Sequence, residues 1–358
     1  MILVLTVIFV ALVFTYTNGF HDTANSIATV VSTKVLTPRQ AVMLATVFNL
    51  AGALVGTAVA STVGKGIVDT NYVNMTTLIC AMIAAIVWNL TTWYYGIPSS
   101  SSHALIGGLI GAALASAHGS WNVVVWTTPG GEHWWQKGGI LYKVILPMFT
   151  SPVCGFVIGL LVMSVLYLLL LRWRPQTVTT VFGKLQLLSA SYMGFAHGTN
   201  DAQKTMGIIT LALFTATKAG ELENLPAYLQ FLHTPQFSVA LWVQIICGIT
   251  MAVGTAAGGW RIIRTLGHKL VKLQPVHGFA AETTGATILY VTAVLGMPVS
   301  TTHAITTAIM GVGAAKNLRS LKLTLIERIL WAWLLTLPAA GLIAYLLVRA
   351  AQMFGWIR

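Results

Sequence analysis

Two copies of an acidic, amide-containing motif interrupt apolar stretches of this chain. Residues 19–26 read GFHDTANS and residues 198–205 read GTNDAQKT, and aligning them places Asp22 on Asp201. An ionisable side chain inside sequence of membrane-spanning length is costly, and such residues usually serve a function. Because the costly feature occurs twice, we interpret the two copies as parts of one functional site.

Carboxylates and amides in these motifs offer the oxygen atoms that bind a hard cation, and a buried carboxylate can also exchange a proton. A transported cation would find its ligands at Asp22, Asn25 and Asp201, so no fixed metal site is expected. The full set of candidates for cation or proton coupling is Asp22, Asn25, Asn200, Asp201, Lys204 and Glu282.

Structural roles compete with coupling for these residues. Asp201 could form a salt bridge with Lys204 inside the membrane, and Asn25 and Asn200 could instead join helices by hydrogen bonds. Glu282 is either a membrane-embedded carboxylate or a residue near the cytoplasmic end of its helix. The sequence leaves these alternatives open.

A second motif, proline followed by hydroxyl residues, also occurs twice. Residues 98–103 read PSSSSH and residues 298–303 read PVSTTH. Such a pattern starts a helix, and a helix N-terminus presents free N–H groups and about half a positive charge. Two such starts suit a tetrahedral oxyanion, although two capped helices without a ligand would give the same pattern. The candidate phosphate-type ligands are Ser99, Ser100, Ser101, Ser102, Ser300, Thr301 and Thr302.

Histidines stand in or beside all four motifs, at positions 21, 103, 197 and 303. A histidine can relay protons near neutral pH, or it can make structural hydrogen bonds, and the sequence does not decide between these roles. The chain has no nucleotide-binding loop and no spacing typical of a nucleophile and its base. We therefore expect neither an enzyme nor a resident cofactor.

Composition places the chain in a membrane. Of its 358 residues 56% are hydrophobic and only 8% charged, whereas soluble proteins carry about 25% charged residues. The long, continuous apolar runs predict helices and not the alternating strands of a barrel. The formal net charge of +12 is spread over loops, which is typical of membrane orientation and argues against nucleic-acid binding.

The fold class expected is an all-α polytopic membrane protein with about twelve apolar segments. Four segments are short or begin at the polar motifs (20–33, 98–117, 199–216 and 298–315), and they look like half-helices that face inward. The full set is 1–17, 20–33, 38–62, 75–96, 98–117, 139–171, 178–196, 199–216, 237–259, 276–296, 298–315 and 324–350.

The order of the motifs makes the first five segments repeat as segments seven to eleven. We therefore expect a first repeat at 1–117, an external loop and connecting helix at 118–177, a second repeat at 178–315 and a closing helix at 316–358. Segments seven and eight should form one broken helix, and segments ten and eleven a hairpin.

Loop charge predicts orientation, because cytoplasmic loops carry an excess of Lys and Arg. Loops 118–138 and 217–236 contain Glu132, Glu221 and Glu223 and few basic residues, so they are expected outside. The second half is then inverted relative to the first, and both chain termini lie outside. Three cytoplasmic loops hold Arg172, Arg174, Arg261, Arg264, Lys269, Lys272, Lys316, Arg319 and Lys322.

Inverted repeats with broken helices are typical of secondary transporters. Twin half-helices also occur in channels for anions or neutral solutes, which remain the alternative. The pair Asp22 and Asp201 favours a carrier, because a channel needs no intramembrane carboxylate pair.

The four motifs, in this order, resemble the signatures of the PiT family of inorganic phosphate transporters, and the wording of both acidic motifs is most similar to the bacterial low-affinity Pit branch. The resemblance implies cation-coupled import of phosphate, free or as a metal–phosphate complex, across the bacterial inner (plasma) membrane. A homo-oligomer in the lipid bilayer is compatible with it. Sodium-coupled members are expected to have Asn where this chain has Lys204, so the resemblance favours protons over sodium.

Overall fold

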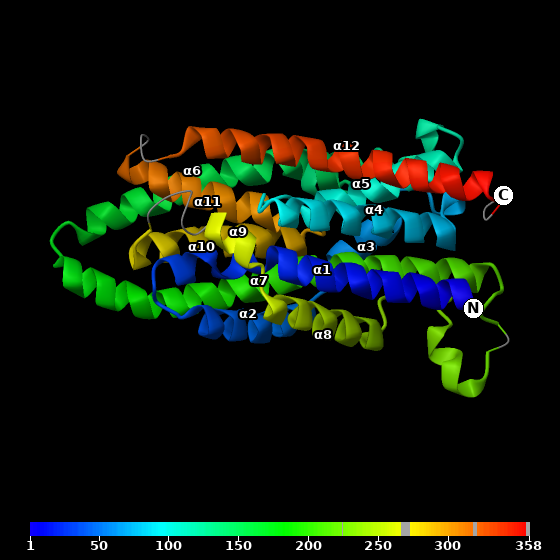
Figure 1. The fold of residues 1–358 in the computed structure, drawn as a ribbon, viewed down its shortest axis with the longest axis horizontal. Helices are drawn as coiled ribbons and strands as arrows, with labels where there is room; N and C mark the ends of the chain where they lie inside the picture. Colours follow the sequence, from blue (N-terminus) through cyan, green and yellow to red (C-terminus); the bar gives the residue numbers. More distant parts are fainter. Residues whose placement is uncertain (224, 266–272, 318–320, 356–358) are drawn as a thin grey trace.

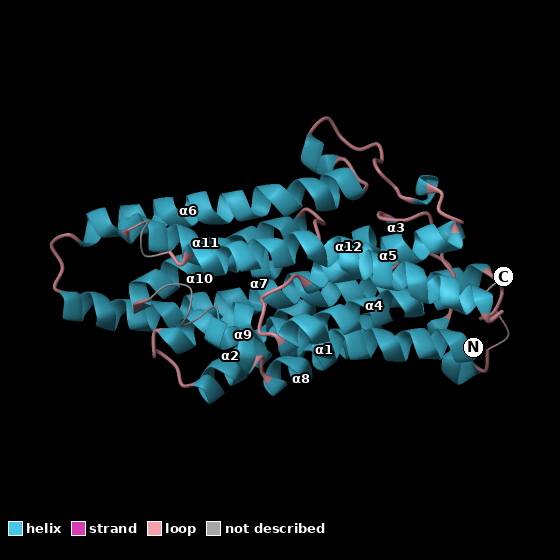
Figure 2. Ribbon diagram, turned by 45° about the horizontal axis from the view of Figure 1, so that its top comes forward, coloured by secondary structure: helices cyan, strands magenta, loops and turns pink. Residues whose placement is uncertain are grey.

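The computed structural model describes residues 1–223, 225–265, 273–317 and 321–355, and this part of the chain folds into an elongated bundle of helices (Figures 1 and 2). Its β-structure consists of two isolated bridges. Lys269, Lys272 and Arg319, which the sequence assigns to cytoplasmic loops, lie outside the described residues. The α-helices are α1 (Ile2–Ser32), α2 (Pro38–Ala53), α3 (Ala58–Lys65), α4 (Met75–Tyr94), α5 (Ser101–Ser116), α6 (Leu146–Leu170), α7 (Pro175–Lys218), α8 (Leu241–Ala257), α9 (Trp260–Arg264), α10 (Pro275–Val294), α11 (Thr301–Lys316) and α12 (Leu323–Met353).

The all-helical, apolar character expected from composition is confirmed. Four of the described helices are long and apolar enough to cross a membrane, or five if the bent pair α2–α3 counts as one span. These helices support a multi-pass membrane protein, and the count of twelve apolar segments stays a prediction.

The helix breaks predicted at the acidic motifs are absent from the described structure. Helix α1 runs unbroken through residues 17–20, and the 44-residue α7 runs unbroken through residues 196–199. A continuous helix satisfies its own backbone groups, so the polar side chains can be paired without opening the backbone. The glycine in the first motif serves packing instead, since a Cβ on Gly19 would lie 2.6 Å from the carbonyl oxygen of Met251 in α8.

Breaks do occur, but in the helices that follow the motifs. Helices α2 and α3 meet at an angle of 72°, and α8 is separated from α9 by Gly258 and Gly259. Gly56 (φ 81°) and Gly258 (φ 72°) adopt the left-handed conformation that glycine tolerates best. The breaks therefore lie at glycines with positive φ. The apolar runs 38–62 and 237–259 did not predict them.

Two helical hairpins, α4–α5 and α10–α11, contain the hydroxyl motifs at their tips. Helices α5 and α11 have 16 residues each and are buried over almost their whole length, as expected of inward-facing half-helices. Small residues let neighbouring helices approach closely. Gly111 of α5 lies against the backbone of Gly341 in α12, and Gly311 of α11 lies against Phe156 in α6.

Both chain termini lie at one end of the bundle, which we call the terminal end (right in Figure 1). The segments 118–138 and 217–236 lie at the same end. The turn between α6 and α7, with Arg172 and Arg174, lies at the opposite end, which we call the far end (left in Figure 1). The acidic segments and the termini thus share one end, and this basic turn occupies the other.

Candidate functional site

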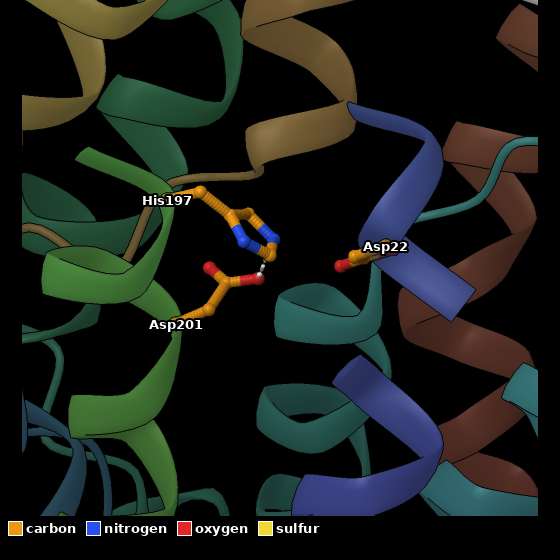
Figure 3. A group of neighbouring side chains, drawn as sticks. All are labelled: Asp22, His197 and Asp201. Carbon is orange, nitrogen blue, oxygen red and sulfur yellow. Dashed lines mark ion pairs between the residues drawn. The ribbon is translucent and has the colours of Figure 1, made fainter. Parts of the chain in front are cut away.

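The two acidic motifs meet inside the bundle. Asp22 of α1 faces His197 and Asp201 of α7, and one ligand atom from each of the three lies within 4.8 Å of the others (Figure 3). All three side chains are buried. The tertiary structure thus joins motifs far apart in the sequence into one cluster whose carboxylate and imidazole groups could hold a cation.

Asp201 lies between a lysine and a histidine of its own helix. Its Oδ1 accepts from the ammonium group of Lys204, and its Oδ2 lies 3.3 Å from Nε2 of His197 (dashed in Figure 3). Lys204 also donates to the hydroxyl of Ser102 and, at 3.3 Å, to the backbone oxygen of Val299. The intramembrane salt bridge considered for Asp201 and Lys204 is therefore present.

Asp22 has a different partner. Nδ1 of His21 lies 2.7 Å from Oδ1 of Asp22, and Nε2 of His21 lies 3.2 Å from the hydroxyl of Thr92. Ser99 extends this network, because its hydroxyl is 2.8 Å from that of Thr92. When His21 is neutral and donates to Asp22, its other nitrogen must accept, so the network fixes how the ring is oriented. Of the hydroxyl candidates, Ser99 thus belongs to the carboxylate side of the site.

The tips of the two hairpins converge on the same place. Nδ2 of Asn25 donates to the hydroxyls of Thr301 and Thr302, at 3.1 and 3.0 Å. The hydroxyl of Ser102 donates to the backbone oxygen of Val299 at 3.1 Å. The starts of α5 and α11 therefore face each other beside the acidic cluster.

Hydroxyl residues at these helix starts divide into two groups. Ser100 and Ser300 are N-caps, each accepting from the N–H three residues on at 3.2 Å, so for these two residues the capping interpretation holds. Helix geometry leaves the N–H groups of Ser101, Ser102, Thr301 and Thr302 without a partner inside their own helices. These groups, unlike the caps, remain available to a ligand.

Several buried polar atoms around the convergence have no hydrogen-bond partner in the described structure. They include the hydroxyls of Ser26, Ser101 and Thr205 and both amide atoms of Asn200. Buried polar atoms are nearly always paired. Unpaired hydroxyls beside free helix N–H groups therefore indicate a place for a polar ligand.

Glu282 belongs to a separate cluster. It accepts from the hydroxyl of Thr29 at 2.6 Å, from the amide of Gln186 at 2.9 Å and from the hydroxyl of Ser189. Thr29 lies seven residues after Asp22, about 10 Å along the helix axis. Glu282 is thus buried, as one alternative held, but stands apart from the Asp22 and Asp201 pair. Sequence reasoning missed its three partners, because Thr29 lies in α1 and Gln186 and Ser189 lie one turn apart in α7, both far from Glu282 in the sequence.

The comparisons with known proteins identify the family. Residues 18–344 match the model of the phosphate transporter family. A probable low-affinity inorganic phosphate transporter of Bacillus subtilis is 42% identical, with 98% of each chain covered, and one of Rhizobium meliloti is 45% identical, with 98% of this chain and 97% of the relative covered.

A solved structure, titled the sodium-dependent phosphate transporter, has the same fold. Its TM-score is 0.81 at 23% identity, with 99% of this chain and 100% of that chain covered. The resemblance drawn from the four motifs is confirmed, and the chain belongs to the phosphate transporter family, a family of transporters rather than enzymes.

Proposed function

We propose that this protein imports inorganic phosphate across the plasma membrane, which is the inner membrane of a bacterium, by coupling phosphate to a cation. The observation that carries the proposal is the convergence of two half-helix starts on a pair of buried carboxylates. Membership of the phosphate transporter family supports phosphate as the substrate. Burial of the whole site supports a carrier over the alternative of an open channel.

Phosphate would bind between the starts of α5 and α11. The free N–H groups of Ser101, Ser102, Thr301 and Thr302 would donate to its oxygens, and the unpaired hydroxyl of Ser101 would add a donor. Ser100 and Ser300 would hold the helix starts in place, and Ser99 would act through the His21 network. Because the donors are neutral, they replace water without holding the anion as tightly as arginine side chains would.

Lys204 supports protons over sodium as the coupling ion. Its ammonium group already occupies a position with a carboxylate, a hydroxyl and a backbone carbonyl as partners, and these oxygens are the ligands of a hard cation. In the first motif the aligned residue is the neutral Asn25. The exchangeable charge would therefore bind on the side of Asp22 and Asn25, while Lys204 supplies a fixed charge. A divalent metal that accompanies phosphate would take its ligands from Asp22, His197 and Asp201.

Glu282 would bind a proton. Among the buried carboxylates of the described residues, Asp22 and Asp201 have histidine or lysine partners, whereas Glu282 has only hydroxyl and amide donors. An isolated buried negative charge is very costly, so the neutral acid is favoured there. The hydroxyl of Ser189 lies 3.2 Å from the backbone oxygen of Gln186. It can therefore donate to that oxygen when it accepts from protonated Glu282.

The polar cluster around Glu282 has no symmetric counterpart among the aligned residues. Aligning residues 98–103 with 298–303 places Met82 opposite Glu282, and the acidic motifs place Ile208 opposite Thr29. Met82 and Ile208 both lie in the hydrophobic core. A proton site with no counterpart toward the terminal end would make the two halves of the carrier differ in proton binding, while the imposed gradients would set the direction of net transport.

Inverted repeats are part of the proposal. Helix α1 packs on α8, and its counterpart α7 packs on α2. In the same way, α5 of the first hairpin packs on α12, and α11 of the second hairpin packs on α6. Both termini lie at the terminal end, together with segments 118–138 and 217–236 (Figure 1). This shared position supports the proposal that all of them are external. The division into repeats at 1–117 and 178–315 follows from the same pairs.

Transport by the purified protein in proteoliposomes tests the proposal. We expect phosphate to accumulate when an inward proton gradient is imposed without sodium, and labelled phosphate to exchange by counterflow. Accumulation that requires a sodium gradient would overturn proton coupling. Phosphate flux without counterflow would favour the channel.

A further inference from the structure

The broken helix pairs α2–α3 and α8–α9 occupy equivalent places in the two halves. Their breaks are at Gly56 and Gly258, and the short helix after each break contacts the tip of the opposite hairpin. The hydroxyl of Thr62 donates to the backbone oxygen of Gly296 at 2.7 Å, and that of Thr265 to the backbone oxygen of Gly96 at 2.9 Å. Each short helix thus covers one hairpin tip, with α3 nearer the terminal end than α9 (Figure 1).

Only α3 is also held by a side chain of the central helices. Oε1 of Gln203 in α7 accepts from the backbone N–H of Val59 at 2.8 Å and of Ala60 at 3.4 Å. Nε2 of Gln203 donates to the backbone oxygen of Thr199 in α7 at 2.7 Å. It also donates, at 3.4 Å, to the backbone oxygen of Val55, which precedes the break at Gly56. One buried amide therefore caps the start of α3 and ties it to α7 and to the end of α2.

No described side chain of α1 or α7 caps the start of α9, which is joined to its hairpin by its own Arg261, whose guanidinium donates to the backbone oxygen of Tyr94. The residue aligned with Gln203 in the first acidic motif is Ala24, which has no polar side chain. The third N–H of α9, that of Ile262, corresponds to that of Ala60 in α3 and donates to the backbone oxygen of Gly259 at 3.0 Å. The start of α9 is thus satisfied by its own backbone.

The tip of the α10–α11 hairpin, beneath α3, is more buried than the tip of the α4–α5 hairpin, beneath α9. Gly296 and Met297, beneath α3, are buried, with Met297 only 3% exposed. Gly96 and Ile97, beneath α9, are half-buried. The tip beneath α3, the helix that Gln203 ties to α7, is thus more fully covered than the tip beneath α9.

We propose that Gln203 is a positioning residue that keeps α3 closed over the tip of the α10–α11 hairpin, so that the route to the site from the terminal end is shut. The inference rests on the proposed transport function, because a closed route has meaning only for a carrier. Without Gln203, α3 would be held by Thr62 and packing alone, whereas α9 is joined to its hairpin by both Thr265 and Arg261.

Cysteine accessibility tests the proposal without phosphate. In a background with Cys80, Cys154 and Cys247 replaced by alanine, Met297→Cys reports on the tip beneath α3 and Ile97→Cys on the tip beneath α9. A membrane-impermeant maleimide is applied to one face of sealed vesicles at a time. Tyr228→Cys, at an exposed residue in segment 217–236, identifies the face of the terminal end.

Gln203→Met keeps the side-chain volume but removes the hydrogen bonds of the tie. We expect labelling of Met297→Cys from the terminal face to rise about tenfold, as the loss of two hydrogen bonds predicts, while labelling of Ile97→Cys from the far face stays unchanged. Gln203→Asn, which retains an amide too short to reach α3, should act in the same direction if the methionine variant does not fold. Gln244→Met removes a glutamine that bonds within its own segment and should change neither rate.

Unchanged labelling of Met297→Cys in folded Gln203→Met would overturn the proposal. An equal rise at both tips would also overturn it, since that result means general loosening. Failure of the phosphate proposal would be seen separately, as absent uptake by the wild-type protein with the labelling contrast intact.

Discussion

At the residue scale, the two carboxylates of the acidic cluster stand in unlike surroundings. Asp201 pairs with the ammonium group of Lys204, whereas the partner of Asp22 is the imidazole ring of His21. Breaking a buried ion pair by removing one partner leaves the other charge uncompensated. The same substitution at the two aspartates should therefore affect transport alike but stability differently.

Asp22→Asn and Asp201→Asn should both abolish gradient-driven phosphate uptake. Asp201→Asn should in addition lose about 3–5 kcal/mol of stability, because the Lys204 charge is left buried and unpaired. Uptake in proteoliposomes and denaturation of the purified variants measure the two effects. The double variant Asp201→Asn with Lys204→Met should recover stability but not transport, and wild-type uptake by either single variant would contradict the coupling role.

Hydroxyl donors at the half-helix starts allow a second test. Ser101→Ala and Thr302→Val each remove one donor to a charged ligand, which costs about 1.5–3 kcal/mol, or roughly ten- to a hundredfold in affinity. We expect the half-saturating phosphate concentration to rise by this factor, and further in the double variant. Ser116→Ala at the opposite end of α5 removes a hydroxyl paired with Thr77 and should leave affinity unchanged. Equal affinities in all variants would mean that the motifs only cap helices.

At the scale of elements, the half-helices are positioned by glycine contacts with α6 and α12. Gly111 has no room for a Cβ, since the backbone of Gly341 fills that space. The hairpin tips thus reach the acidic cluster because small residues let α5 and α11 lie close to the helices behind them.

Gly111→Ala should lose about 1–3 kcal/mol of stability through overpacking and should weaken phosphate binding by moving α5. Gly183→Ala in α7 is a matched control, because its Cβ would meet only a side-chain atom of Val35 at 4.0 Å. Alanine is preferred to glycine inside a helix, so this variant should be at least as stable as the parent. Denaturation in detergent measures both, and equal stability of the two variants would argue against the close contact.

At the scale of the whole molecule, the arrangement of ends makes the proposed orientation in the membrane testable. Both termini and the acidic segments share the terminal end, and the Arg172–Arg174 turn lies at the far end (Figure 1). Because cytoplasmic loops carry an excess of basic residues, we expect the far end to face the cytoplasm.

Cysteines at Trp121, Tyr228 and Arg172, in the cysteine-free background, test this orientation. The first two should react with an impermeant maleimide from outside, and the third only from inside, since all three positions are exposed. Labelling of whole cells and of inverted vesicles provides the two faces. Reaction of Trp121→Cys and Tyr228→Cys from opposite faces would contradict the inverted-repeat proposal.

The sequence by itself determined the class of the protein and its family. Composition and long apolar runs require lipid-facing helices, and four motifs in one order identify the family, because these are properties of residue type and spacing. It also identified the short helices at 98–117 and 298–315, since a proline and a serine cap mark a helix start locally.

Tertiary structure decided what depends on contacts between distant segments. Helices α1 and α7 run unbroken through their acidic motifs, and α3 begins where Gln203 of α7 caps it. Glu282 acquires its surroundings from two other helices, with Thr29 in α1 and Gln186 and Ser189 one turn apart in α7. Local sequence carries no signal for such contacts, because each partner is an ordinary polar residue until the fold brings it within hydrogen-bond distance.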